Sequence, residues 1–554
     1  MKKTFSILLA ALAMLAMAVG CGKPEVKPEE KAEPVVATIT ASDVTVEEGK
    51  TVQITAATNS SAAISYASAD AAVATVSAAG LVTGVKAGST TVTLSVAAVE
   101  DKFTAAEATI NVTVSSGEVP PPEDLKALTL SASVDGDGIF DGSPFYTMHV
   151  TNPNSVEVEA RIQSRVSTDF KKEVAKVDYM EKIPANSTKD IVITPEADSW
   201  EPGFYKANCY VDGKSRVGIA FGIRPFEIVS APDMQPDFDE FWTVAYEQLT
   251  KVDMNVSFVP TKRDGTWMVS MQSIPDGLEG DPMVIRCYYI EPANDGKKHP
   301  AIVHYYGYDD FPGTTKLDLP SGISGYAHLW VSARGQRINA RAASLRSDGI
   351  EEDFVNPYSQ QWFTVNFGDK NSYYYRGAYM DCVQGIRFLA LCEDEKVAGR
   401  IDMDNVFVEG MSQGGAFSYA AAALSIEYPV RAIAPGVAFM GDFPDYFVIA
   451  AGDGGGFPGM AEDCKKQLKW DDAQMYAFMS YFDTKNLATR ISCPIFANIG
   501  LLDNICPPHT NIAPYNNALT PAADKEMTFY PKMGHSVPSG WETKYKNFFQ
   551  NHMK

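Results

Sequence analysis

Basic residues are scarce in this sequence of 554 residues. It has 47 lysines and arginines against 69 aspartates and glutamates, so its formal net charge is −22. Binding to nucleic-acid phosphates requires clustered cations, and the acidic balance therefore argues against a nucleic-acid partner. Apolar residues make up 45% and charged residues 21% of the chain, which is an ordinary globular composition. This composition excludes a wholly disordered chain and a membrane protein with several spans.

Cysteine is also sparse, and its spacing lacks the patterns of metal or redox sites. The chain has eight cysteines, and no two of them form a C-x-x-C pair or a zinc-binding spacing. Seven remain after Cys21, an odd number that cannot all pair within the chain. We expect these seven to be small buried apolar residues with one or two disulfides among them. We expect neither a metal nor an organic cofactor.

The N-terminus carries a short apolar run behind two lysines. This run, Phe5 to Val19, is too short to span a bilayer as a folded helix. It leads into Ala18-Val19-Gly20-Cys21, which resembles a bacterial lipoprotein signal, in which the cysteine is lipidated and becomes the new N-terminus. Residues 1–20 are then a signal peptide and residues 21–35 a tether, and the protein is expected on the cell envelope, periplasmic or at the cell surface. The alternative is a general secretory signal with a coincidental cysteine.

Changes in residue pattern divide the rest of the chain. The length corresponds to roughly four domains at about 150 residues each. Short alternating β-runs with turn residues between them predict two β-sandwich domains, and a later alternation of apolar β-runs with helical stretches predicts an α/β domain. The predicted segments are a β-sandwich at 36–117, a proline-rich linker at 118–124, a second β-sandwich-like domain at 125–229 and an α/β domain with a mostly parallel, doubly wound sheet at 230–554.

The first β-rich segment contains a recognisable string. Residues 72–89 read AVATVSAAGLVTGVKAGS, which resembles the pattern before the last strand of the bacterial group-two immunoglobulin-like domain. Such modules are usually spacers or adhesive units. The segment shows no aromatic cluster suited to sugar stacking, so we interpret it as a spacer.

The segment Gly410-Met-Ser-Gln-Gly-Gly415 carries the sharpest chemical signal. It contains G-x-S-x-G between a buried strand at 405–409 and a helix-forming stretch rich in small residues at 416–425. A strand, a tight turn and a helix form a nucleophile elbow, in which glycines permit the strained turn and the helix dipole faces the serine hydroxyl. We therefore interpret Ser412 as a nucleophile and the domain as an α/β-hydrolase. The alternative is a glycine-rich turn with an inert serine.

A serine nucleophile needs a base, and in this fold the order along the chain is Ser, then Asp or Glu, then His. Asp503 follows a predicted strand at 495–499, and His535 follows one at 526–530. Both are expected with Ser412 at strand ends that converge on one crevice. His509 lies only six residues past Asp503, and His552 lies in the last three residues, where fraying is expected. The alternatives are a capping carboxylate at 503 and a structural loop histidine at 535.

The oxyanion of acyl transfer needs two N–H donors that are in place before charge develops. The backbone of Gln413, the residue after the nucleophile, is expected to supply one. The second is expected from Tyr308, because Gly307 lets this loop after the strand at 301–305 turn its N–H toward the crevice. Loss of one such donor costs about 3–4 kcal/mol of transition-state stabilisation.

Several separated strings make the α/β domain similar to the acetyl xylan esterase and cephalosporin-C deacetylase family, carbohydrate esterase family seven. They are Asp237–Trp242, Ser332–Gln336 with R-G-Q, Ser372–Arg376 with Y-Y-Y-R, Gly410–Gly415, Ser480–Asp483 and Gly500–Pro508 with G-L-x-D-x-x-C-P-P. The resemblance implies an α/β-hydrolase with Ser412 as nucleophile, His535 as base and Asp503 as the acid that orients it. It also implies the amides of Tyr308 and Gln413 as oxyanion donors.

The sequence departs from this family in two respects. Tyr306 stands where the family has the His of an H-G-Y loop, and because that His does not supply the N–H we keep Tyr308 as the donor. Family members are commonly bare catalytic domains in ring-like hexamers with inward-facing sites. Two N-terminal β-domains and a lipid anchor favour a monomer or small oligomer open to larger acetylated glycans, and the oligomeric state stays open.

Together these residues predict a serine esterase that removes acetyl groups from acetylated xylan or related oligosaccharides through an acetyl-enzyme. One alternative is a secreted serine peptidase of the prolyl-oligopeptidase type, although no repeat of about 40–50 residues indicates a propeller. Another is a glycan-binding surface protein with an inactive hydrolase domain, against which the intact Ser, Asp and His argue.

Overall fold

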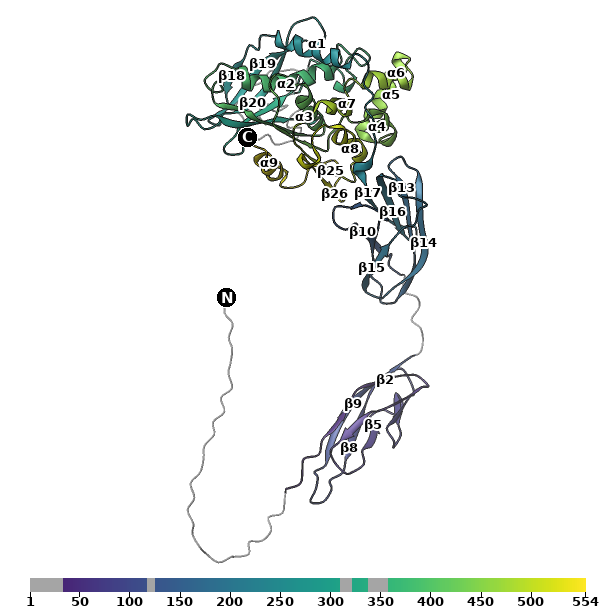
Figure 1. Cartoon of the computed structure of the whole chain (residues 1–554). Coiled ribbons are helices and arrows are strands. Elements are labelled where there is room, and N and C mark those ends of the chain that lie inside the picture. The colour runs from purple at the N-terminus through teal and green to yellow at the C-terminus, as the bar shows by residue number, and fades with distance from the viewer. Residues whose placement is uncertain (1–32, 117–124, 309–320, 337–356) are drawn as a thin grey trace, which may run out of the picture. The chain divides into compact units, whose positions relative to one another are not determined.

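The computed structural model describes residues 33–116, 125–308, 321–336 and 357–554 (Figure 1). The predicted signal peptide, Cys21, most of the predicted tether and the proline-rich linker lie outside the described residues. The chain forms two compact units, Met1–Leu125 and Lys126–Lys554, so the middle β-domain and the α/β domain belong to one unit. Among the described residues, none of the helices combines the length and the apolar character needed to cross a bilayer.

The first unit is a β-domain of short strands. They are β1 (Ile39–Ala41), β2 (Val44–Glu47), β3 (Thr51–Gln53), β4 (Ala56–Thr58), β5 (Ser65–Ser68), β6 (Ala74–Val76), β7 (Leu81–Gly84), β8 (Gly88–Val96) and β9 (Ala106–Ser115). Two sheets have the orders β2-β9-β8-β5 and β3-β7-β6, and β1 pairs with β4. Alternate residues of β8 and β9, such as Val92, Leu94 and Val112, are buried, as expected for strands with one face on a core.

The middle domain also consists of two sheets around one core. Its strands are β10 (Thr129–Ser133), β11 (Ile139–Phe140), β12 (Tyr146–Asn152), β13 (Val158–Thr168), β14 (Glu173–Ile183), β15 (Ser187–Ile193), β16 (Gly203–Val211) and β17 (Ser215–Ile223). They form the sheets β10-β12-β15 and β11-β17-β16-β13-β14. Tyr205 is buried in this core, and Trp200 packs against it. The Asp135–Gly138 segment is a turn, with the Gly138 amide donating to the Asp135 carbonyl over 3.2 Å.

The α/β domain is built on a mixed sheet. Its strands are β18 (Ser257–Pro260), β19 (Thr266–Ser273), β20 (Met283–Ile290), β21 (His299–Tyr305), β22 (Ala327–Ser332), β23 (Ile401–Met411), β24 (Ala432–Gly436), β25 (Ile495–Gly500) and β26 (Lys525–Tyr530). Within the described residues, their order is β18-β19-β20-β22-β21-β23-β24-β25-β26. The pairs from β22 to β26 are parallel, and β18, β19 and β20 add an antiparallel extension.

Helices cover both faces of this sheet. They are α1 (Phe238–Thr250), α2 (Tyr374–Leu391), α3 (Gln413–Leu424), α4 (Phe443–Ile449), α5 (Phe457–Leu468), α6 (Asp472–Met479), α7 (Thr484–Leu487), α8 (Pro508–Asn517) and α9 (Trp541–Asn551). The larger core joins α1, α2 and α3 to one face, and α9 packs on the other through Trp541 and Phe549. Because the parallel strands share one direction, the loops after β21, β22, β23, β25 and β26 meet at one edge.

The cysteines correct one expectation. All seven cysteines of the described residues are free thiols, so the predicted disulfides are wrong for this part of the chain. The thiols belong to separate elements: Cys209 lies in the middle-domain core, Cys287 on β20 and Cys382 on α2, each buried among apolar side chains. Burial raises the pKa of the Cys209 thiol to about 11, which keeps it neutral and unreactive.

The middle domain packs directly on two loops at the carboxyl edge of the α/β sheet. A buried apolar group, which we call the junction cluster, joins the two domains and consists of Phe204, Ala220, Ile228, Ile499, Leu501, Ile512 and Phe529. Gly138 of the middle domain comes so close that a Cβ there would lie 3.0 Å from Leu501 and 3.1 Å from Pro531. The middle domain therefore supports the segments that follow β25 and β26.

Candidate active site

Ser412 sits in a strained turn between β23 and α3. Its φ and ψ are 60° and −122°, a region that non-glycine residues rarely adopt. The glycines around it leave no room for a side chain. A Cβ at Gly414 would lie 2.2 Å from the Tyr305 carbonyl oxygen, and one at Gly410 would lie 2.5 Å from the Gly414 carbonyl oxygen. The glycines of the motif therefore let β23 and α3 approach closely enough to hold the serine in this conformation.

The structure brings Ser412, His535 and Asp503 together. His535 Nε2 lies 2.9 Å from Ser412 Oγ, and His535 Nδ1 lies 2.8 Å from Asp503 Oδ2. Ser412 follows β23, Asp503 follows β25 and His535 follows β26. Along the chain, His535 is 123 residues from Ser412 and 32 residues from Asp503. When Nδ1 donates to Asp503, Nε2 is free to accept the serine proton, which is the arrangement that activates a hydroxyl.

Asp503 is held in place on its other side. Only 1% of its surface is exposed, and its Oδ1 accepts hydrogen bonds from the amides of Ile505 and Cys506, both over 2.9 Å. These amides fix the carboxylate and stabilise its negative charge. The carboxylate can therefore orient the His535 imidazole without rotating away from it.

The loop after β21 lies against the serine turn. A Cβ at Gly307 would be 3.9 Å from Ser412 Cβ, and the Gly307 carbonyl accepts a hydrogen bond from Gln336 Nε2 over 2.7 Å. Tyr308 extends from this loop, with its hydroxyl donating to Gln361 Oε1 over 3.0 Å. Gln413 is the first residue of α3, and its buried side chain accepts from the Tyr375 hydroxyl over 2.8 Å. Gln413 thus directly follows Ser412, and Tyr308 directly follows the glycine that lies beside it.

Gln336 and Tyr375 are residues that reasoning on catalytic groups alone did not single out. Both lie in family strings, R-G-Q and Y-Y-Y-R, but the strings do not reveal what the side chains touch. The structure shows that Gln336 holds the backbone of the Gly307 loop and Tyr375 holds the side chain of Gln413. Both therefore act on the position of the predicted oxyanion donors.

Replacing Gln336 should slow catalysis by loosening this loop. We expect Gln336→Ala to lower kcat by about tenfold to a hundredfold, somewhat less than the loss of an oxyanion donor, with KM nearly unchanged. Steady-state kinetics with p-nitrophenyl acetate measures both constants. Gln361→Ala is the matched control, because it removes a glutamine that bonds the Tyr308 hydroxyl and leaves the loop backbone held. Equal kcat values for the two variants would contradict the role of Gln336.

The other two late histidines have different surroundings. His552 directly follows α9, and its Nδ1 lies 2.8 Å from the carbonyl oxygen of Phe548 in that helix. His509 Nδ1 lies 3.0 Å from Asp169 of the middle domain, and its Nε2 lies 3.2 Å from Asp445 of α4. Neither of them contacts Ser412, and His509 instead links the two domains.

His509 must donate from both ring nitrogens, because each faces a carboxylate oxygen. Only the imidazolium can do so. Burial by itself opposes this charge, but the hydrogen bonds to Asp169 and Asp445 outweigh it and raise the pKa of His509 to about 9. The positive charge is therefore retained at neutral pH.

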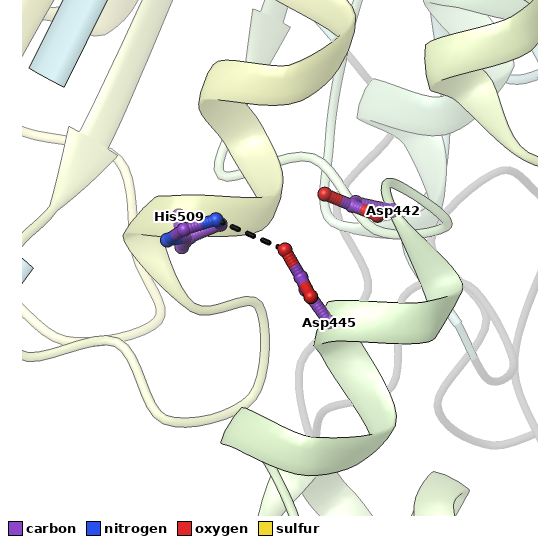
Figure 2. Close-up of side chains that lie close together, drawn as sticks. All are labelled: Asp442, Asp445 and His509. Carbon is purple, nitrogen blue, oxygen red and sulfur yellow. Dashed lines mark ion pairs between the residues drawn. The ribbon is translucent and has the colours of Figure 1, made fainter. Parts of the chain in front are cut away.

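One group of side chains has the spacing to coordinate a metal ion. Ligand atoms of Asp442, Asp445 and His509 all lie within 4.8 Å of one another, and His509 points toward Asp445 in Figure 2. The Asp442 carboxylate already accepts from Lys485 Nζ over 2.9 Å, and His509 is held as a cation. Two positive charges in this cluster oppose a metal ion, so the arrangement fits an ion-pair network better than a metal centre.

The ion pairs of His509 with Asp169 and Asp445, which we call the His509 bridge, predict that the protein loses stability at alkaline pH. The pKa of His509 is about 6.5 in the unfolded chain and about 9 in the folded protein. This difference adds about 3 kcal/mol to the free energy of unfolding. The contribution is complete below pH 6.5 and is lost as the pH rises through 9. The groups that face His509 are Asp169 and Asp445, with Asp442 and Lys485 behind Asp445. We expect the melting temperature of the wild type to exceed that of His509→Gln at pH 6 and to approach it near pH 10. A constant difference across this range would contradict the bridge.

Comparison with known proteins adds an independent result. Residues 227–553, more than half of the chain, match the family model described as acetyl xylan esterase (AXE1). Residues 36–117 match the model described as bacterial Ig-like domain (group 2). Both resemblances that the sequence motifs predicted are confirmed.

The chain is also similar to individual proteins. Acetyl esterase Axe7A of Xylanibacter ruminicola is 26% identical over 356 residues, which are 63% of this chain and 73% of that protein. Two solved structures each align with 59% of this chain and 98% of their own. They are acetyl xylan esterase 1 from Thermoanaerobacterium sp. (22% identity, TM-score 0.48) and an acetyl xylan esterase from Paenibacillus sp. R4 (25% identity, TM-score 0.46).

Proposed function

Because the chain belongs to the acetyl xylan esterase family and is a serine carboxylic-ester hydrolase, we propose that it removes acetyl groups from acetylated xylan or related oligosaccharides, with Ser412 as the nucleophile. The observation that carries this proposal is the hydrogen-bonded series Ser412–His535–Asp503 at the edge of the sheet. The family description, acetyl xylan esterase, supports acetylated xylan as the substrate class, and the curated relative is named an acetyl esterase.

The contacts support the following mechanism. Ser412 Oγ attacks the acetyl carbonyl carbon while His535 Nε2 takes the hydroxyl proton and Asp503 stabilises the imidazolium that forms. The amides of Gln413 and Tyr308 donate to the oxyanion of the tetrahedral intermediate. His535 then gives the proton to the ester oxygen of the sugar, the bond between that oxygen and the carbonyl carbon breaks, and the sugar leaves as an alcohol while the acetyl group stays on Ser412. Water, deprotonated by His535, then releases acetate and restores the serine.

Acetate release from a panel of glycans tests this function. We expect the purified protein to release acetate from acetylated xylan and its oligosaccharides and to leave proline-containing peptides intact. Release from p-nitrophenyl acetate without release from any acetylated glycan would retain the esterase and overturn the proposed substrate. Cleavage of the peptides would revive the peptidase alternative, which the family assignment does not favour.

A glycan-binding protein with an inactive hydrolase domain is not favoured either. An inactive domain has no need to keep the serine in a strained turn within 2.9 Å of a histidine that is itself held by a buried carboxylate. Covalent labelling of Ser412 by a fluorophosphonate separates the two, because this reagent needs an activated serine. An unlabelled protein would favour the inactive alternative.

The proposal extends to the location of the enzyme. The sequence before residue 36 supports a lipoprotein attached through Cys21 to the cell envelope, and two β-domains, which we interpret as β-sandwiches, separate that cysteine from the esterase domain along the chain. The acidic net charge supports a glycan rather than a nucleic acid as the partner. In cells, we expect Cys21→Ser to abolish lipid labelling and to release the protein from the membrane fraction. A Cys21→Ser protein that stays in that fraction would contradict the anchor.

A further inference from the structure

A cleft of about 270 Å³ lies where the middle domain meets the α/β domain. One wall consists of side chains from the end of β13 and from β16, among them Ser167, Lys206 and Asn208. Ser167 and Lys206 are partners in the β13–β16 register, so they stand side by side on the sheet. The facing wall includes Asp453 and Asn504 of the α/β domain. We call this space the junction cleft.

The two walls are fixed relative to each other. Lys171 Nζ of the middle domain donates to the Ala451 carbonyl over 2.8 Å, and both residues line the cleft. The imidazolium of His509 joins Asp169, another lining residue, to Asp445. The junction cluster buries apolar side chains of both domains beside them. The cleft is therefore preformed, which reduces the entropy lost when a ligand binds.

The cleft presents hydrogen-bonding groups that no described residue satisfies. The Lys206 ammonium group makes no hydrogen bond or ion pair within the described part of the chain. The side-chain oxygen Oδ1 of Asn208 accepts from Arg216 over 2.8 Å, while the side-chain NH₂ group of Asn208 has no partner among the described residues. Asn504 donates to one oxygen of Asp453 over 2.8 Å, which leaves the other oxygen of that carboxylate as an acceptor. Donors thus line one wall, and an acceptor faces them.

This lining selects the chemistry of the ligand. Two lysines, Lys171 and Lys206, and two carboxylates, Asp169 and Asp453, line the cleft, so its lining presents both signs rather than a surface of one sign for an ion. An apolar ligand would leave polar groups buried without partners, at a cost in free energy. A neutral compound with several hydroxyl groups satisfies donors and acceptors together. Phe170, between two lining residues in the chain, is 41% exposed and packs its ring edge-on against His509.

We propose that the junction cleft binds a sugar residue of the same glycan chain whose acetyl group is at Ser412. This proposal rests on the proposed function. Asn504 lines the cleft and directly follows Asp503, the acid that bonds His535, so the cleft adjoins the loop that carries the catalytic acid. The middle domain thereby becomes part of the substrate site, and longer acetylated chains are bound better than single acetylated sugars.

Substitutions on the middle-domain wall test the proposal without touching the α/β domain. We expect Lys206→Ala/Asn208→Ala to lower kcat/KM for acetylated xylan about tenfold, chiefly through KM, because two or three hydrogen bonds to the sugar are lost. Hydrolysis of p-nitrophenyl acetate, which is too small to reach the cleft, should stay at the wild-type rate. Ser167→Trp, which fills the cleft, should reproduce this pattern. Lys214→Ala is the matched control, since it removes a lysine from the β16–β17 turn outside the cleft.

The outcomes separate this proposal from the proposed function. Equal kcat/KM of the wild type and both cleft variants on acetylated xylan would overturn the sugar site while leaving the esterase intact. Absence of acetate release from acetylated xylan by the wild type would instead overturn the proposed function. Competition by unacetylated xylo-oligosaccharides gives a second readout: we expect them to inhibit the wild type and to inhibit Ser167→Trp at least tenfold less. Equal inhibition of both proteins would also count against the cleft.

Discussion

Ser412→Ala is expected to lower turnover of p-nitrophenyl acetate by at least about 10⁴-fold while the protein stays folded. The substitution removes the oxygen that attacks the carbonyl carbon and leaves His535 and Asp503 in place. Steady-state rates, burst-phase acetylation and fluorophosphonate labelling measure the effect, and the melting temperature verifies folding. Alanine keeps the Cβ atom that makes a φ of 60° unfavourable, so the backbone strain is unchanged and stability should stay close to that of the wild type.

Ser418→Ala is the matched control for this experiment. Ser418 lies on α3, the helix that follows Ser412, is fully buried and donates to the Gly414 carbonyl over 3.0 Å, but does not contact His535. We expect it to keep turnover within about tenfold of the wild type. A Ser412→Ala protein with a rate similar to that of Ser418→Ala would remove Ser412 as the nucleophile.

The largest loss of stability is expected from Asp381→Ala. Asp381 and Arg334 form a bidentate pair, with Nε–Oδ2 and Nη2–Oδ1 distances of 2.9 and 2.7 Å, and both side chains are fully buried. Burial opposes the charge of Arg334, and Asp381 offsets this effect and raises the arginine pKa. Removal of the carboxylate leaves a buried charge with less compensation, so we expect a decrease of about 3–5 kcal/mol in the free energy of unfolding.

Denaturant unfolding checks this value, and two comparisons sharpen it. Glu427→Ala breaks the pair with Arg387, where the carboxylate side chain is 54% exposed, and should cost less than about 1 kcal/mol. The double variant Arg334→Met/Asp381→Leu removes both charges and should be more stable than Asp381→Ala alone. A double variant less stable than the single one would show that contacts other than the ion pair set the cost.

The pairing also explains a glycine in the sequence. A Cβ at Gly377 of α2 would lie 1.8 Å from Arg334 Nη1, so the helix can pass the guanidinium only where it lacks a side chain. Arg334 follows β22 in the same turn as Gln336, the residue that holds the Gly307 loop. The R-G-Q string thus combines one residue that anchors the turn with one that positions the active-site loop.

Local sequence patterns were sufficient to predict the buried strands of the sheet and the catalytic residues that follow them. Strands at 301–305, 405–409 and 495–499 were predicted from buried apolar runs, and β21, β23 and β25 contain them. Ser412, Asp503 and His535 could be nominated because strand order in this fold constrains where catalytic residues occur along the chain. Each nomination depended on one motif or on a position just after a strand.

Contacts between distant segments could not be predicted in the same way. His509 was considered only as a possible base, because nothing near it in the sequence indicates that Asp169, 340 residues earlier, faces its Nδ1. The junction cluster and the approach of Gly138 to Leu501 depend on how two domains dock, which hydrophobic periodicity within each domain does not encode. The predicted disulfides were wrong because cysteine counts carry no information on distance.

The packing of the middle domain on the segments after β25 and β26 has a consequence for how this protein can evolve. Recombination near residue 225 would separate the esterase domain from the middle domain. The segments that hold Asp503 and His535 would then lose the apolar contacts that the middle domain makes with them. A break before residue 125 leaves that contact whole, so loss, duplication or replacement of the first β-domain does not disturb it. We expect the last two domains to be inherited as a pair, and the first to vary among their descendants.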